Sequence, residues 1–314
     1  MINRRSVLLG GLAGLGGLGA ALVGCSGPAS PPAAPSAAAL GPSPAAAEVA
    51  ARRLADLEAG FGGRLGVFAL DTGSGASVGH RADERFLLCS TAKAFGVSAV
   101  LNLSLREPGL LERRIPYTSA QVVSYSPITK SHAGAGMTVA ELCAAALTVS
   151  DNTAHNLLLG VLGGPGALTG FVRGLGDPLT RFDRWEPQLN FTSAGDERDT
   201  GTPSWLVRDL RSVTLGTALP PAERDRLVGW LTANTTGAQQ IRAGVPAGWR
   251  VADKTGSGEQ GESNDLAVVW PPGRAPLVIA VYTAPTDPAN QTGKATIAAA
   301  TAAAVSALSP VGAR

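Results

Sequence analysis

The chain has 314 residues, of which 45% are hydrophobic and 16% are charged, and this composition is typical of globular proteins and excludes a disordered chain. The formal net charge is +2, and the basic residues are scattered along the sequence. This excludes the basic run or patch by which nucleic-acid-binding proteins are usually recognised. We expect one or two domains.

The first 25 residues have the pattern of an export signal. Arg4-Arg5 precede an apolar, glycine-rich stretch over residues 7–23, which ends in Leu22-Val23-Gly24-Cys25. A single membrane-spanning helix is the alternative, but such a helix needs about 20 strongly apolar residues, and this stretch holds many glycines. The ending is similar to a bacterial lipoprotein cleavage site, and Arg4-Arg5 are similar to a twin-arginine signal. We therefore expect a lipoprotein anchored through Cys25 on the outer side of the cytoplasmic membrane or in the periplasm.

A segment rich in Pro, Ala and Ser follows over residues 26–47 and predicts a semi-extended tether. Three cysteines in an exported protein raise the alternative of one disulfide plus a free thiol. If Cys25 carries lipid, Cys89 and Cys143 remain. Cys143 lies in an apolar helical run over residues 139–149, and we expect both thiols to behave as buried small hydrophobes without a disulfide.

The remaining elements follow in chain order. Residues 46–59 predict an amphipathic helix, and residues 64–71 predict a strand that turns at Thr72-Gly73-Ser74-Gly75 into a hairpin partner over residues 76–80. Between about residues 88 and 230 the pattern is mainly helical, including helices over 137–150 and 151–162. The final part predicts short strands over 250–253, 265–270 and 277–283, and an alanine-rich helix over 295–308.

Strands near both ends, with helices between them, predict that the two ends of the chain share one sheet. This is an α+β arrangement with an inserted helical domain. We expect an α/β domain formed by residues 48–85 and 232–311, and an all-α domain formed by residues 86–231. The three histidines are isolated and more often structural, so no metal site is expected; they are His80, His132 and His155.

Lysine is scarce in this chain. Only four of the 26 basic residues are lysines, namely Lys93, Lys130, Lys254 and Lys294. Two of them, Lys93 and Lys254, fall inside short motifs with Ser or Thr. A desolvated lysine can lose its proton, whereas an arginine effectively cannot. This pattern is typical of a site that moves protons.

Three short motifs carry the chemistry. Ser90-Thr91-Ala92-Lys93 places a hydroxyl and an amine three residues apart, on one face of a helix that begins there. Ser150-Asp151-Asn152 stands at a break between two helical runs, and Lys254-Thr255-Gly256 lies in a predicted strand. Alone, each has an ordinary explanation, namely a surface pair, an N-cap and a strand end. In this order, however, they are the set found in class A β-lactamases and penicillin-binding proteins.

On these motifs the chain resembles the class A serine β-lactamases from about residue 60 to residue 300. The resemblance implies a five-stranded antiparallel sheet flanked by helices, with an inserted all-helical domain. It also implies hydrolysis of the β-lactam ring of penicillins and cephalosporins through an acyl-serine intermediate, which confers antibiotic resistance. No cofactor, no metal and no nucleic acid are implied as partners. We expect a monomer that binds small β-lactam substrates.

The same resemblance implies a role for each motif residue. Ser90 is the nucleophile, Lys93 is its proton partner, and Ser150 relays a proton to the leaving nitrogen. Asn152 contacts the side-chain amide of the substrate.

At the other side of the cleft, the resemblance places Lys254 and Thr255 at the carboxylate end of the substrate. The backbone N–H groups of Ser90 and Ser257 form the oxyanion hole. The Ser257 hydroxyl is also expected to favour cephalosporins.

The β-lactamases differ from the penicillin-binding proteins in having a general base that activates water. The penicillin-binding proteins share the three motifs but deacylate slowly. The segment from Arg184 to Asn190, Arg-Trp-Glu-Pro-Gln-Leu-Asn, resembles the Ω-loop of the class A enzymes. In that loop, expected over about residues 181–200, Glu186 and Asn190 hold the hydrolytic water. Arg184 and Asp199 form the ion pair that pins its base.

Four other positions bear on the substrate. Tyr125 matches the aromatic wall at the cleft mouth, with a packing tyrosine as the alternative. Ala92 and Gln188 depart from the family, which usually has a bulky aromatic residue and Glu there. Gly258 stands where several carbapenemases have the cysteine that pairs with the one at the position of Cys89, which argues against strong carbapenem turnover.

The family complements the substrate carboxylate with an arginine beside the Lys-Thr-Gly strand. The two most familiar sources fall on Gln240 and Ser263, which carry no charge. A third falls near Lys294, which we favour over Arg242, because the family's arginine at that position looks structural. The ordinary alternative is a surface lysine at a helix N-terminus, where the helix dipole slightly disfavours it.

Two other functions remain open. The first is a cell-wall carboxypeptidase or a β-lactam-sensing binder, and the Glu186 loop argues against it. The second is a catalytically idle lipoprotein, and the intact nucleophile and lysines argue against that.

Overall fold

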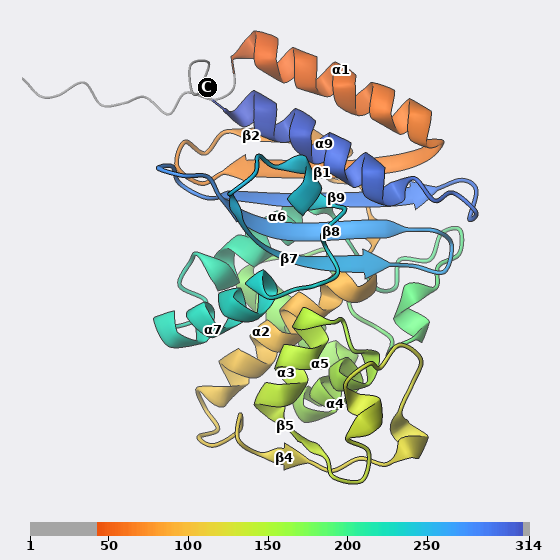
Figure 1. Cartoon of the computed structure of the whole chain (residues 1–314), viewed down its shortest axis with the longest axis vertical. Coiled ribbons are helices and arrows are strands. Elements are labelled where there is room, and N and C mark those ends of the chain that lie inside the picture. The colour runs from red at the N-terminus through yellow and green to blue at the C-terminus, as the bar shows by residue number, and fades with distance from the viewer. Residues whose placement is uncertain (1–42, 310–314) are drawn as a thin grey trace, which may run out of the picture. The chain divides into compact units, whose positions relative to one another are not determined.

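A computed structural model describes residues 43–309 of the chain, which belong to one compact unit (Figure 1). The predicted export signal, Cys25 and most of the predicted tether lie outside the described residues.

A five-stranded antiparallel sheet forms the centre of this unit, with the strand order β2-β1-β9-β8-β7. Its strands are β1 (Gly63–Asp71), β2 (Ser77–His80), β7 (Arg250–Ser257), β8 (Ser263–Trp270) and β9 (Leu277–Pro285). Strand β1 pairs with β9 along its whole length, from Gly63 opposite Pro285 to Asp71 opposite Leu277. The prediction that both ends of the chain share one sheet is therefore confirmed, as is the α+β class.

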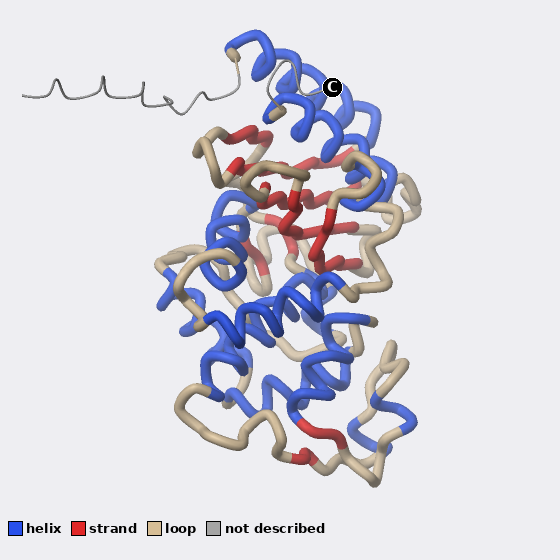
Figure 2. Tube along the Cα trace, turned by 60° about the vertical axis from the view of Figure 1, so that its left-hand side comes forward, coloured by secondary structure: helices blue, strands red, loops and turns tan. Residues whose placement is uncertain are grey.

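Helices cover both faces of the sheet (Figures 1 and 2). Along β9, Ile279 and Val281 pack with α1 (Pro44–Phe61) and α9 (Gly293–Leu308) on one face, whereas Val278, Ala280 and Tyr282 pack with the helices of the middle segment on the other. Neighbouring residues of a strand point to opposite faces. Since both faces are covered, the inner strands read as continuous apolar runs.

The first helix corrects the predicted tether. Helix α1 begins at Pro44, and Ser43 Oγ accepts a hydrogen bond from the backbone N–H of Ala46 at 3.2 Å. Serine is a favoured N-cap and proline a favoured first helical residue. Residues 44–47 therefore belong to the helix and not to the tether.

The middle segment is mainly helical, as predicted. It contains α2 (Ala92–Ser104), α3 (Val139–Thr148), α4 (Asn152–Leu162), α5 (Pro165–Leu175), α6 (Pro203–Thr214) and α7 (Pro221–Thr232), and the short α8 (Ile241–Gly244) follows. It is not all-helical, however. Two-residue strands pair β3 (Phe86–Leu87) with β6 (Thr200–Gly201) and β4 (Arg114–Ile115) with β5 (Met137–Thr138). Pairs this short leave no period in the sequence.

One buried side chain clamps the sheet to the segment before α2. Asn264 Nδ2, on β8, donates to the carbonyl of Leu87 at 2.8 Å, and Asn264 Oδ1 accepts from the backbone N–H of Thr283 at 3.3 Å. Asn264 is fully buried. The amide therefore fixes the position at which the chain leaves β3 and enters α2.

Replacement of Asn264 with Ala should lower the free energy of unfolding by about 1–3 kcal/mol, because it leaves the Leu87 carbonyl and the Thr283 N–H without a buried partner. Urea unfolding measures the change. Gln291→Ala is the control, because the exposed Gln291 bonds only to the nearby Ala289 carbonyl, and its effect should stay below about 0.5 kcal/mol. Equal stability of Asn264→Ala and the control would contradict the clamp.

Candidate active site

The first motif forms a buried hydrogen-bonded cluster. Ser90 lies in the 3-10 turn η1 (Cys89–Thr91), directly before α2, so Lys93 follows it by one helical turn. Lys93 Nζ lies 2.5 Å from Ser90 Oγ, 2.8 Å from Asn152 Oδ1 and 2.5 Å from Glu186 Oε1. An ammonium group has three donors. Lys93 is fully buried, and each of its three donors has a partner in a different part of the site.

In the second motif, Asp151 has a structural role that Ser150 and Asn152 do not share. Asp151 is the N-cap of α4, where its Oδ1 accepts from the Ala154 N–H at 2.9 Å. Its Oδ2 accepts from the N–H groups of Ile128 and Thr129, both at 2.9 Å. Asp151 thus provides the N-cap that was the ordinary explanation of this motif. The side chains of Ser150 and Asn152 are therefore free to take part in the site.

The third motif brings a second buried lysine to the same place. Lys254 Nζ, on β7, donates to Ser150 Oγ at 3.0 Å and to the Thr255 carbonyl at 2.8 Å. Burial, together with the positive charge of Lys93, lowers the pKa of Lys254 to about 7. A lysine with such a pKa exchanges a proton near neutral pH, as a relay through Ser150 requires.

Glycine at position 256 permits β7 to run directly against η1. A Cβ there would lie 3.0 Å from both the Leu88 carbonyl oxygen and Cys89 Cβ, and 3.3 Å from the Ser90 nitrogen. A Cβ at such distances would push η1 and β7 apart by a few tenths of an ångström. The close approach explains how the end of β7 and the nucleophile come to share one cleft.

The Ω-loop presents Glu186 to the same cluster. Asn190 Nδ2, in the 3-10 turn η4 (Gln188–Asn190), donates to Glu186 Oε2 at 2.5 Å. Asn156, on α4, accepts from the Glu186 N–H and donates to the Glu186 carbonyl, both at 2.9 Å. Burial disfavours the charged carboxylate, but the charge of Lys93 outweighs it, and the pKa of Glu186 is lowered to about 2. Glu186 is therefore ionised at neutral pH.

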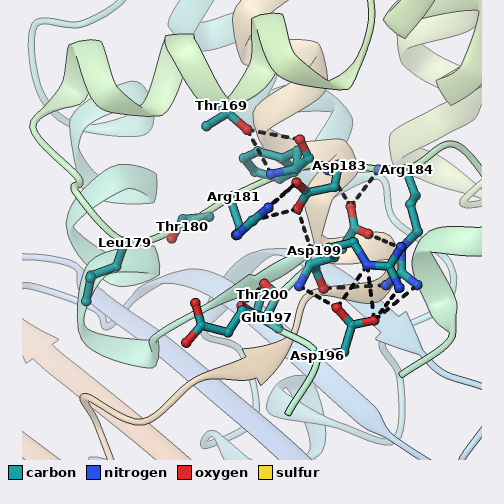
Figure 3. A network of polar contacts seen from close by, with 12 residues as sticks. Thr169, Leu179, Thr180, Arg181, Asp183, Arg184, Asp196, Glu197, Asp199 and Thr200 are labelled. Carbon is teal, nitrogen blue, oxygen red and sulfur yellow. Dashed lines mark hydrogen bonds and ion pairs between the residues drawn. The ribbon is translucent and has the colours of Figure 1, made fainter. Parts of the chain in front are cut away.

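Arg184 and Asp199 close the base of this loop (Figure 3). Arg184 Nε lies 2.5 Å from Asp199 Oδ2, and the other carboxylate oxygen accepts from the N–H groups of Asp183 at 2.8 Å and Arg184 at 3.1 Å. Arg181 adds an ion pair with Asp183 at 2.6 Å. The predicted ion pair is thus present, within a larger polar network.

A cleft of about 310 Å³ opens above the cluster. Eight of the predicted site residues line it, namely Ser90, Tyr125, Ser150, Asn152, Asn190, Thr255, Ser257 and Lys294. Tyr125 is 62% exposed, as a residue at the mouth would be. Three buried residues do not line the cleft but form hydrogen bonds to residues that do: Lys93 to Ser90, Glu186 to Asn190 and Lys254 to Ser150. All the predicted catalytic side chains therefore meet at one place.

The structure distinguishes the two cations considered for the substrate carboxylate. Lys294, at the start of α9, lines the cleft. Arg242 instead donates to Asp253 Oδ1 at 2.7 Å and to the Thr232 carbonyl at 3.0 Å. Arg242 therefore has structural partners of its own.

The two cysteines among the described residues are buried, as predicted. Cys89 and Cys143 are both buried free thiols, and burial raises the pKa of each. A Cβ added at Gly258 would lie 3.2 Å from Cys89 Sγ. Among residues 43–309, no group of three or more His, Cys, Asp or Glu side chains is arranged to hold a metal ion.

Two residues of the site escaped the sequence analysis. Asn156 anchors the backbone of Glu186, and His155 lies 3.9 Å from Glu186 Oε1. Their positions in the sequence could have indicated a place near the site, because residues three and four positions after Asn152 lie on the same face of its helix.

Proteins similar to this chain in sequence and fold are named as β-lactamases. The sequence model of the "Beta-lactamase enzyme family" matches residues 49–308. The chain is 52% identical to the β-lactamase AST-1 of Nocardia asteroides over 260 residues, which is 83% of this chain and 84% of that protein. It is also 52% identical to the carbapenem-hydrolysing β-lactamase KPC of Klebsiella oxytoca over 80% of this chain and 86% of that protein.

Solved structures give the same result. The class A β-lactamase from Mycobacterium abscessus matches with a TM-score of 0.79 and 59% identity, over 81% of this chain and 97% of that chain. The last common ancestor of Gram-negative class A β-lactamases matches with a TM-score of 0.81 and 52% identity, over 83% of this chain and all of that one. With its Ser90 cluster, its Ω-loop carboxylate and these relatives, the chain belongs to the class A serine β-lactamase family.

Proposed function

We propose that this enzyme hydrolyses penicillins and cephalosporins with Ser90 as the nucleophile and Glu186 as the base that activates water. The observation that carries the proposal is the buried contact of Lys93 Nζ with both Ser90 Oγ and Glu186 Oε1, at 2.5 Å each. Lys93 thereby links Ser90, which forms the acyl-enzyme, to Glu186, which is needed for its hydrolysis.

Acylation begins when Ser90 Oγ attacks the carbonyl carbon of the β-lactam ring. The hydroxyl proton passes to the Lys93–Glu186 pair, and Ser150, held by Lys254, delivers a proton to the leaving nitrogen as the C–N bond breaks. The proton on the pair then passes to Ser150, which restores its hydroxyl and leaves Glu186 ionised. The N–H groups of Ser90 and Ser257 stabilise the negative charge on the carbonyl oxygen, where loss of one donor typically costs about 100- to 1,000-fold in rate.

Deacylation needs a positioned water. Glu186 and Asn190 hold it, Glu186 accepts its proton, and the oxygen of the water attacks the ester carbon. Ser90 then leaves as its oxygen takes the proton back from Glu186 through Lys93. The 2.5 Å contact between Asn190 Nδ2 and Glu186 Oε2 supports this pairing. The penicillin-binding proteins share the three motifs but deacylate slowly, so the Glu186 geometry favours a β-lactamase over a cell-wall carboxypeptidase.

Substrate recognition divides along the cleft. Asn152 binds the side-chain amide of the antibiotic, and Tyr125 forms a wall at the mouth. Thr255 and Lys294 bind its carboxylate, and the Ser257 hydroxyl favours cephalosporins. Because Gly258 offers no sulfur to Cys89, we propose weak turnover of carbapenems.

Location and organisation complete the proposal. The enzyme is exported, by the twin-arginine route, and is held at the membrane by a lipid on Cys25. It acts as a monomer, with an α/β domain of residues 44–85 and 232–309 and a middle domain of residues 86–231.

Replacement of Glu186 with Gln should leave acylation possible and block deacylation, because the base for water is lost while the Ser90 machinery survives. Mass spectrometry of the intact protein after treatment with benzylpenicillin should show a stable adduct on Ser90. Ser90→Ala is the control and should show none. Unchanged steady-state turnover in the Gln variant would remove Glu186 from this role.

Replacement of Lys294 with Ala should raise KM for benzylpenicillin severalfold or more with little change in kcat. A charged hydrogen bond of about 1.5–3 kcal/mol corresponds to roughly 10- to 150-fold in affinity, less in a wet cleft. Lys294→Arg should be tolerated. If Lys294→Ala keeps the wild-type KM while Arg242→Ala raises it in a folded protein, the anchor is Arg242.

Replacement of Cys25 with Ala should remove the lipid anchor, because one acyl-bearing cysteine is the proposed tether. Fractionation of cells should find the wild type with the membrane and the variant either unprocessed or released. The same distribution for both proteins would contradict the anchor.

A further inference from the structure

A buried histidine beside Glu186 has no role in the steps above. His155 lies on α4, one turn after Asn152, and is 1% exposed. Neither of its ring nitrogens has a hydrogen-bond partner among the described residues. Buried polar groups are nearly always paired, so an unpaired one calls for an explanation.

The ring lies between the carboxylate and a glycine. Nδ1 is 3.9 Å from Glu186 Oε1, the oxygen that also accepts from Lys93 Nζ. On the other side, a Cβ added at Gly96 of α2 would lie 2.9 Å from Nε2. Gly96 therefore leaves the space that the imidazole occupies.

The charges around the ring fix its protonation. Burial lowers the pKa of His155, and the charges of Lys93 and Lys254 add to this effect, while Glu186 opposes it. The ring is therefore neutral at neutral pH and carries one N–H. Glu186 is the only anion among these neighbours, so the proton belongs on Nδ1, which faces it.

A distance of 3.9 Å is too long for a hydrogen bond. In the free enzyme Oε1 accepts one hydrogen bond, from Lys93. A carboxylate oxygen has a second lone pair, however, and contacts at a catalytic carboxylate that are long in the free enzyme often tighten once substrate is bound. A shift of less than about 1 Å would bring the imidazole N–H into hydrogen-bond range.

We propose that His155 is a positioning residue for the general base: once substrate is bound, its Nδ1–H donates to Glu186 Oε1 alongside Lys93. The inference rests on the proposed role of Glu186. The ring keeps its proton throughout, so it takes no part in the proton balance of the reaction. It holds the carboxylate oriented and favours the charged form.

The consequence appears in the pH dependence. A hydrogen bond to the charged form of a carboxyl lowers its pKa, so loss of the donor makes Glu186 take up a proton at higher pH. A protonated Glu186 cannot accept a proton from water. Deacylation should then fail at a higher pH than in the wild type.

Two substitutions separate the N–H from the shape of the ring. His155→Phe keeps a ring but has no donor, and His155→Asn keeps an N–H close to the position of Nδ1. We expect the acid limb of kcat for benzylpenicillin, followed from about pH 2 to 8, to move upward by about half to one pH unit in His155→Phe. His155→Asn should restore most of the wild-type limb.

An acid limb that is the same in wild type, His155→Phe and His155→Asn would overturn the proposal, as would equal shifts in both variants. Absence of any hydrolysis by the wild-type enzyme would instead overturn the proposed function. The two failures are therefore distinguishable.

A second pair of variants covers the case in which His155→Phe does not fold. Gly96→Ala should displace the ring and move the acid limb, because its Cβ would press on Nε2. In the His155→Asn background, which has no atom there, Gly96→Ala should leave the limb in place. The same effect of Gly96→Ala in both backgrounds would contradict the role of His155.

Discussion

The site depends on one buried charge pair, the ammonium of Lys93 and the carboxylate of Glu186. Both side chains are fully buried and lie 2.5 Å apart. Removal of one partner from such a pair costs about 3–5 kcal/mol, because the other is left charged and unpaired. Lys93 lies on α2 and Glu186 lies on the Ω-loop. The rest of the fold must therefore hold α2 and the Ω-loop at a fixed position relative to each other.

Several contacts far from the chemistry meet this requirement. Asn264 fixes the entry to α2 from the sheet, Asn156 binds the Glu186 backbone from α4, and the Arg184–Asp199 pair closes the Ω-loop. Four non-glycine residues at the site or at the base of that loop adopt positive φ, namely Cys89, Tyr125, Ser150 and Asp199. Such backbone costs about 1–3 kcal/mol per residue and persists only where the surroundings enforce it.

Most of the fold and the site could be predicted from the sequence, since the motifs are local and the strands are long apolar runs. What could not be predicted depends on contacts between distant segments. The β3–β6 pair is too short to leave a pattern, and the start of α1 at Pro44 was hidden within a Pro- and Ala-rich segment. His155 looked like an isolated histidine, because its closeness to Glu186 follows only from the folded Ω-loop.

The most direct test of this account is nitrocefin hydrolysis by the purified enzyme and by its Ser90→Ala variant. The account predicts catalytic turnover by the wild type and only background hydrolysis by the variant, because a serine hydrolase without its nucleophile cannot form the acyl-enzyme. Turnover that survives in folded Ser90→Ala, or a wild type that binds nitrocefin without opening it, would contradict the assignment of Ser90 and its cluster as the catalytic centre.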